Sequence, residues 1–154
     1  MKHRGRIIFF AFIAALMLSE MIGSNLWSLI GPLEDTAKFM GVSVAEERVR
    51  LIILIILDAI PGIGALLAVQ GYRRSGSRRT GRNGVIITTF GMLAYGSYQF
   101  TSAIFQLGDR QSFVMLVGVV YASLGVAAWF IGRDLRQAVV SPDDLAEHGT
   151  NKVH

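Results

Sequence analysis

The sequence has no cysteine among its 154 residues, and only three prolines and three histidines. Without cysteine the chain can form no disulfide, thiolate nucleophile or cysteine-ligated metal centre. His3, His148 and His154 all lie near the ends of the chain, so no histidine in its middle can ligate haem or complete a Ser/His/Asp arrangement. We therefore predict a protein that is not an enzyme and that holds no cofactor or metal.

Charged residues are also scarce, at 17%, whereas hydrophobic residues make up 52% and the mean hydropathy is +0.47. This composition is too apolar for a typical soluble domain. A bilayer core about 30 Å thick needs about 20 apolar residues per helix. The sequence has room for four such spans, at residues 7–31, 51–71, 84–107 and 112–132.

The segments between these spans carry recognisable helix signals. Ser43 and Glu46 fit a capping box, which predicts that the second helix begins at about Val44. Residues 32–50 otherwise form a mixed-charge loop with one short surface turn, and residues 72–83 form a basic linker without a hydrophobic pattern. Three pairs of small residues are spaced to allow close approach of helices. These pairs are Ser19 with Gly23, Gly64 with Ala68, and Gly118 with Ala122.

These features predict an all-α, integral membrane four-helix bundle. The turn at residues 108–111 is very short, so the third and fourth helices must be antiparallel neighbours. Residues 1–135 form the four-span domain, and residues 136–154 form a polar tail. Within this tail Ser141 and Pro142 start a short peripheral helix, because proline suits the first helical position.

The distribution of lysine and arginine predicts the orientation. Short cytoplasmic segments of membrane proteins carry an excess of these residues, and here they gather in the leader, the linker and the tail. The arginines of the linker are Arg73, Arg74, Arg78, Arg79 and Arg82. We therefore expect a multi-pass protein of the cell (cytoplasmic) membrane with both termini in the cytoplasm. The linker arginines serve as topology signals or contact anionic lipid, and nucleic-acid binding is not expected.

Two carboxylates lie deep inside predicted spans. At 1.5 Å per residue, Glu20 lies roughly 21 Å and Asp58 roughly 18 Å from the cytoplasmic face, and no lysine or arginine lies inside any span. The same count puts Tyr95 and Gln99 of the third helix and Tyr121 of the fourth near that depth. Ionisable groups at such depth cost about 2.5 to 3.5 kcal/mol each on insertion scales and usually face the bundle interior. Two such acids without a base should share a proton or hold a cation.

A proline follows Asp58 by three residues. Pro61 lacks a backbone N–H, so the carbonyl of Leu57 loses its helical partner. Gly62 beside it allows another backbone or a ligand to approach closely. Pro61 and Gly62 are therefore predicted to form a flexible point in the second helix, similar to the ion sites of broken-helix transporters.

Two functions follow from this pattern. In the first, the polar side chains only bind neighbouring helices, and the protein is a non-catalytic accessory subunit that packs against a partner membrane subunit or a second copy. In the alternative, the protein is a small proton- or cation-coupled transporter or channel component. Its proton- or cation-binding residues are then Glu20, Asp58, Tyr95, Gln99 and Tyr121.

The segment Ser19-Glu20-Met21-Ile22-Gly23 resembles the first helix of the small multidrug resistance transporters. In that family a single membrane-embedded glutamate in a four-helix subunit binds protons and cationic drugs. The resemblance implies proton or cation handling at Glu20. The present chain departs from that family in its greater length, its basic linker and tail, and its strong charge bias.

Overall fold

The structure is a computed structural model, which describes residues 3–74, 77–104 and 109–137. These residues are almost entirely helical and contain no strand, so the all-α prediction is confirmed for this part of the chain. The elements are α1 (Arg4–Glu20), η1 (Met21–Leu26), α2 (Trp27–Ile30), α3 (Leu33–Met40), α4 (Val44–Arg73), α5 (Arg78–Ile104), α6 (Asp109–Ile131) and α7 (Arg133–Gln137). The predicted helix from Ser141 lies outside the described residues.

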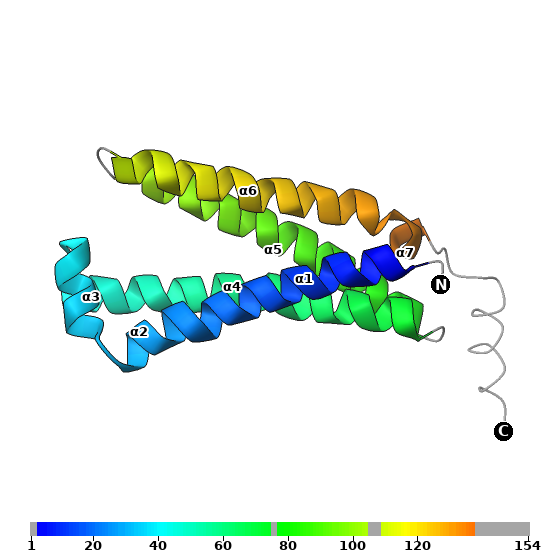
Figure 1. Cartoon of the computed structure of the whole chain (residues 1–154), viewed down its shortest axis with the longest axis horizontal. Helices are drawn as coiled ribbons and strands as arrows, with labels where there is room; N and C mark the ends of the chain where they lie inside the picture. The colour runs from blue at the N-terminus through cyan, green and yellow to red at the C-terminus, as the bar shows by residue number, and fades with distance from the viewer. Residues whose placement is uncertain (1–2, 75–76, 105–108, 138–154) are drawn as a thin grey trace, which may run out of the picture.

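The long helices run alongside one another (Figure 1). α1 packs against α4, α4 packs against α5, and α5 packs against α6. The chain reverses direction from each long helix to the next, so α3 lies at one end of the molecule. The N-terminus, the end of α4 and α7 lie at the other end. The predicted antiparallel contact between the last two long helices is therefore confirmed.

Three helical segments are long and apolar enough to cross a membrane. They are Arg4–Ile30, Val44–Arg73 and Gln111–Ile131. Their outer faces expose large apolar side chains, including Ile8, Ile63 and Phe130, as expected where lipid surrounds a helix. The fourth long helix, α5, has 27 residues, but its sequence is more polar and it is not among these candidate spans.

Local signals explain where α4 begins and why α3 ends. The predicted capping box is confirmed: the Glu46 N–H donates to Ser43 Oγ at 3.2 Å, and the Ser43 N–H donates to Glu46 Oε2 at 2.9 Å. α3 is a complete eight-residue helix rather than a single turn, and it ends at Gly41 with a φ of 70°. This left-handed conformation favours glycine.

The connection between α4 and α5 is shorter than predicted. α4 continues to Arg73 and α5 begins at Arg78, so most of the predicted linker at residues 72–83 is helical. The reason is the contact between Gly71 and Gly81, where a Cβ atom on Gly71 would lie 2.3 Å from Gly81 Cα. The two backbones touch at this point, which keeps both helix ends packed.

Small residues also allow close contact between α4 and α5 nearer the middle of these helices, and between α5 and α6. Two of the three predicted pairs of small residues lie at these contacts. A Cβ on Gly64 would lie 2.7 Å from the Thr88 nitrogen, and a Cβ on Gly84 would lie 2.4 Å from the Ala68 nitrogen. The pair Gly118 and Ala122 of α6 likewise meets Gly96 of α5. The prediction for Ser19 and Gly23 is wrong within this chain. Both residues are exposed, and a Cβ on Gly23 would meet nothing within 4 Å.

Candidate carboxylate site

Glu20 lies at the last position of α1 and is held by two tyrosines from other helices. The Tyr95 hydroxyl of α5 donates to Glu20 Oε1 at 3.0 Å, and the Tyr121 hydroxyl of α6 donates to Glu20 Oε2. The centroids of the two tyrosine rings are 4.5 Å apart. Three of the residues predicted from helix depth therefore meet, because the long tyrosine side chains of α5 and α6 reach the end of α1.

Asp58 lies on α4, and its side chain is fully buried. Its Oδ2 accepts a hydrogen bond of 2.6 Å from Asn25 Nδ2, whereas its Oδ1 is buried without a hydrogen-bond partner. Glu20 is close enough to Asp58 for the two carboxylates to interact electrostatically. Within the described residues, no ion pair involves either of them.

Asn25 was not among the predicted site residues. It belongs to η1, a six-residue π-helix that follows Glu20 directly. On a regular α-helix, two residues five positions apart differ by about 140° in direction, at 100° per residue. The wider π turn, with i→i+5 hydrogen bonds, brings such residues onto one face. Glu20 and Asn25 thus both reach the interior, and π segments of this kind are frequent at functional sites.

Gln99 was predicted to join the site, but no side-chain hydrogen bond from it to Glu20 or Asp58 occurs in the described part of the chain. Its backbone carbonyl accepts from Ser102 Oγ at 2.9 Å, and its side chain is half-buried. Tyr98, one residue earlier in α5, interacts electrostatically with Arg50 and Glu47 of α4.

A second buried carboxylate of α4 was also missed. The Glu47 side chain is fully buried and forms two hydrogen bonds with Arg50, of 2.6 Å to Nη2 and 2.7 Å to Nε. Glu47, Leu51, Leu54 and Asp58 follow one another at spacings of four, three and four residues, and all are buried. This helical spacing, counted back from Asp58, could have identified Glu47 from the sequence.

Pro61 does not interrupt α4, which is continuous from Val44 to Arg73. The proline packs against α5, where a Cβ on Gly91 would lie 2.9 Å from Pro61 Cδ. A Cβ on Gly62 would lie 3.0 Å from the Leu18 side chain of α1. The expected close approach at Gly62 is therefore present, whereas flexibility at Pro61 and Gly62 stays a prediction.

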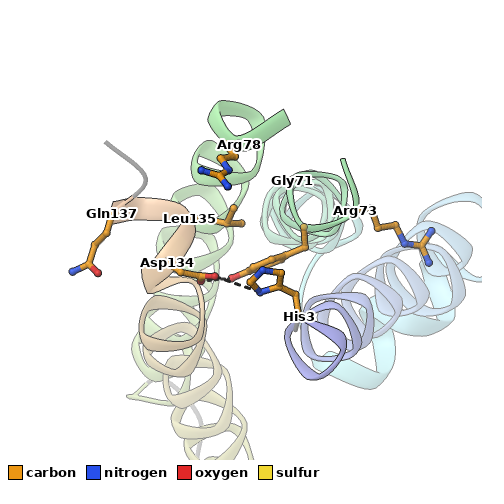
Figure 2. Close-up of a pocket in the computed structure, with 8 residues that line it drawn as sticks. His3, Gly71, Arg73, Arg78, Asp134, Leu135 and Gln137 are labelled. Carbon is orange, nitrogen blue, oxygen red and sulfur yellow. Dashed lines mark hydrogen bonds and ion pairs between the residues drawn. The ribbon is translucent and has the colours of Figure 1, made fainter. Parts of the chain in front are cut away.

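The arginine-rich ends of α4 and α5 border a pocket of about 660 Å³ at the α7 end of the molecule (Figure 2). Asp134 of α7 accepts a hydrogen bond of 2.9 Å from the Tyr72 hydroxyl, pairs with Arg6 of α1, and lies 3.6 Å from His3 Nδ1. Arg73 and Arg78 line the same pocket, and Figure 2 shows Arg73 directed away from Asp134. This cluster joins three helix ends.

The described part of the chain contains no group of three or more His, Asp or Glu side chains that could hold a metal ion. The fold and the buried carboxylates thus define an all-helical protein with three helices suited to crossing a membrane. Comparisons with family models, with characterised proteins and with solved structures gave no match. The likeness of residues 19–23 to the small multidrug resistance transporters therefore remains a short resemblance.

Proposed function

We propose that the protein crosses the cell membrane four times, with α5 as the remaining span and both termini in the cytoplasm. α5 packs between α4 and α6 and has a length similar to theirs. Its polar side chains Thr88 and Tyr95 are buried against these neighbours, so its polarity need not face lipid. The ends of α1, α4 and α5 that carry most arginines lie together, and the positive-inside rule makes this the cytoplasmic end.

We propose further that a proton or a small cation binds between Glu20 and Asp58. The observation that carries this proposal is the Oδ1 atom of Asp58, which is buried and lacks a partner while a second carboxylate lies nearby. A buried charge without a partner is costly, so such a group takes up a proton or a cation. In a membrane, residues of this kind commonly mark proton or ion pathways.

The neighbouring donors determine which atom holds the proton. The amide of Asn25 donates to Oδ2 of Asp58, so that oxygen already acts as an acceptor. Oδ1 is then the atom free to carry a proton or to coordinate a cation. At Glu20 both oxygens already accept hydrogen bonds from tyrosine hydroxyls. In this arrangement Asp58 Oδ1 supplies the exchangeable position, and Glu20 is the second carboxylate beside it.

The test uses the variants Glu20→Gln and Asp58→Asn and the double variant, purified and reconstituted into vesicles. We expect each variant to elute as a folded protein, and the double variant to lose pH-dependent proton uptake and flux. Glu34→Gln, which changes an exposed carboxylate in α3, is the matched control and should behave as the wild type. Wild-type flux in the double variant would exclude the proposal.

A second candidate is an accessory subunit of a membrane complex or a homo-oligomer. The observation that favours it is the open small-residue face at Ser19 and Gly23, which would admit a helix from another chain at close range. Native mass measured after gentle extraction from the membrane distinguishes these cases. A stoichiometric unrelated polypeptide supports the accessory role, whereas a homo-oligomer alone favours transport.

A further inference from the structure

Polar and charged side chains are unevenly distributed on the two sides of the carboxylates. Toward α3, the tyrosines that hold Glu20 are followed by Tyr98, one turn further along α5, and by the buried pair of Glu47 and Arg50. Arg50 is close enough to both Tyr98 and Tyr95 to interact with them electrostatically. These groups form a series of polar side chains that leads from the carboxylates toward the surface, where 34% of the Arg50 side chain is exposed.

The opposite direction is filled mainly by apolar side chains, and the buried polar residues among them are the uncharged Thr88 and Thr89 of α5. From Glu20 back to Arg6, α1 covers roughly 21 Å at 1.5 Å per residue, and its buried positions there are all apolar. They are Phe10, Ile13, Ala14 and Met17. They pack with Ala65 and Ala68 of α4, Val85 and Met92 of α5, and Ala128 of α6. No charged side chain is buried in this layer in the described part of the chain.

From this asymmetry we infer that the carboxylate pair exchanges its proton or cation only with the solution on the α3 side, along Tyr95 and Tyr98 and past the Glu47–Arg50 ion pair. The inference rests on the proposed function. It adds to that function the direction of access and three positioning residues, which are Tyr98, Glu47 and Arg50. The path follows α5, since Leu51 and Leu54 fill the face of α4 between its two buried carboxylates.

The Glu47–Arg50 pair is suited to closing the outer end of this path. Both oxygens of the buried Glu47 are bonded to Arg50, which fixes the guanidinium beside Tyr98. A fixed positive charge at this position limits the access of cations. Because part of Arg50 is exposed, its side chain can turn toward water and leave the path open.

The absence of cysteine allows the direction of access to be measured by labelling single cysteines. The full-length variants Tyr95→Cys and Met92→Cys are compared in vesicles of both orientations, with a membrane-impermeant methanethiosulfonate reagent. These residues are one helical turn apart and equally buried, with 1% and 0% exposure. Val42→Cys in the loop after α3 and Arg79→Cys at the start of α5, both exposed, identify the two sides.

We expect the reagent to label Tyr95→Cys from the side that labels Val42→Cys, and to label Met92→Cys from neither side. Labelling of Tyr95→Cys from the Arg79 side, from both sides or from neither side overturns the inference, as does equal labelling of Met92→Cys. If Tyr95→Cys fails to fold, the half-buried Tyr98→Cys and the fully buried Thr88→Cys are used instead, and the side from which Tyr98→Cys is labelled decides the inference. Glu47→Gln should raise the labelling rate of Tyr95→Cys about fivefold, the effect of releasing a partly exposed ion pair, and an unchanged rate excludes the pair as the closing element.

A separate measurement distinguishes this inference from the proposed function. The infrared band of a protonated carboxyl group is followed during a pH titration of the wild type and of Asp58→Asn. If the band titrates in the wild type and is lost in the variant, proton binding at Asp58 stands whatever the labelling shows. If the wild type has no such band and binds no cation, the proposed function fails, and the labelling then reports only water access.

Discussion

At the carboxylates, tyrosine, glutamate, asparagine and aspartate side chains connect different helices, and toward α3 the Glu47–Arg50 pair lies within α4. Between the carboxylates and α7, α4 and α5 contact one another through glycine, alanine and threonine, with backbones close enough to exclude a Cβ atom at Gly64 and Gly84. Figure 1 shows α5 and α6 drawing apart from α1 and α4 toward the α3 end. Long side chains therefore connect the helices where they separate, and small residues connect them where they meet.

This difference has consequences for what each half can do. A hydrogen bond between long side chains can be exchanged for one with water at little net cost. A contact between two backbones has no such substitute, because opening it leaves a cavity. The small-residue half is thus suited to hold the fold together, and the polar half is suited to admit water or a cation. Substitutions in the two halves should separate these roles.

The largest effect is expected in the small-residue half. In Gly84→Ala the new methyl group would lie 2.4 Å from the Ala68 nitrogen and 2.6 Å from the Gly64 oxygen, so α4 and α5 must move apart. We expect the free energy of unfolding in mixed micelles to fall by about 3 kcal/mol, the upper range for overpacking.

The control for this prediction is Gly23→Ala, another helical glycine, whose added Cβ would meet no atom within 4 Å. Its free energy of unfolding should change by less than about 0.5 kcal/mol. Equal losses for the two variants would mean that helix contact does not explain the difference between the halves.

An intermediate effect is expected at the Glu47–Arg50 pair in the polar half. Removing one partner of a fully buried pair costs about 3 to 5 kcal/mol. Because Arg50 can reach water, we expect Glu47→Gln to lower the free energy of unfolding by only about 2 kcal/mol. Arg48→Gln, at an exposed neighbouring position, should leave the stability unchanged.

Replacing both partners separates stability from access. In the double variant Glu47→Leu with Arg50→Met, no charge remains unpaired, and apolar replacement of a buried pair is often neutral for stability. We expect near wild-type unfolding together with slower labelling of Tyr95→Cys from the α3 side, because two apolar side chains would then fill the outer end of the polar path in place of a pair that can open toward water. A stable double variant with unchanged labelling would show that the polar half does not conduct through this pair.

The sequence predicted the long helices from their hydrophobic length, and counting 1.5 Å per residue placed several of their polar residues at similar levels along them. The start of α4 was predictable from the side chains of Ser43 and Glu46. Glu20, Tyr95 and Tyr121 were predicted at similar levels along their helices, and their hydrogen bonds agree with that count. These features depend on local chemistry or on distance along a single helix.

The features that the sequence did not predict depend on the direction of side chains around a helix. Asn25 reaches Asp58 because η1 departs from the α-helical repeat. No residue pattern in the sequence predicted this π-helical segment. The early start of α5 depends on the tertiary contact between Gly71 and Gly81. Gln99 was placed at a similar level by counting along its helix, but no hydrogen bond joins its side chain to Glu20 or Asp58 among the described residues.

The smallest effect is expected at the α7 end, where Asp134 joins Arg6, His3 and Tyr72. Asn in place of Asp134 can still accept the hydrogen bond of Tyr72, but it loses the ion pair with Arg6. Because 34% of the Asp134 side chain and 40% of the Arg6 side chain are exposed, the loss should be about 0.5 to 1 kcal/mol at low salt. At 1 M salt the Debye length falls to about 3 Å, so the stabilities of the wild type and of Asp134→Asn should converge.

Arg133→Gln, at the exposed adjacent position, is the control for a general charge effect. If the difference between wild type and Asp134→Asn persists at high salt, the cluster stabilises the helix ends by packing and hydrogen bonding, as in the rest of the small-residue half. A difference that disappears means that charge holds this end, which would make the closed side of the molecule sensitive to the ionic strength of the solution beside it.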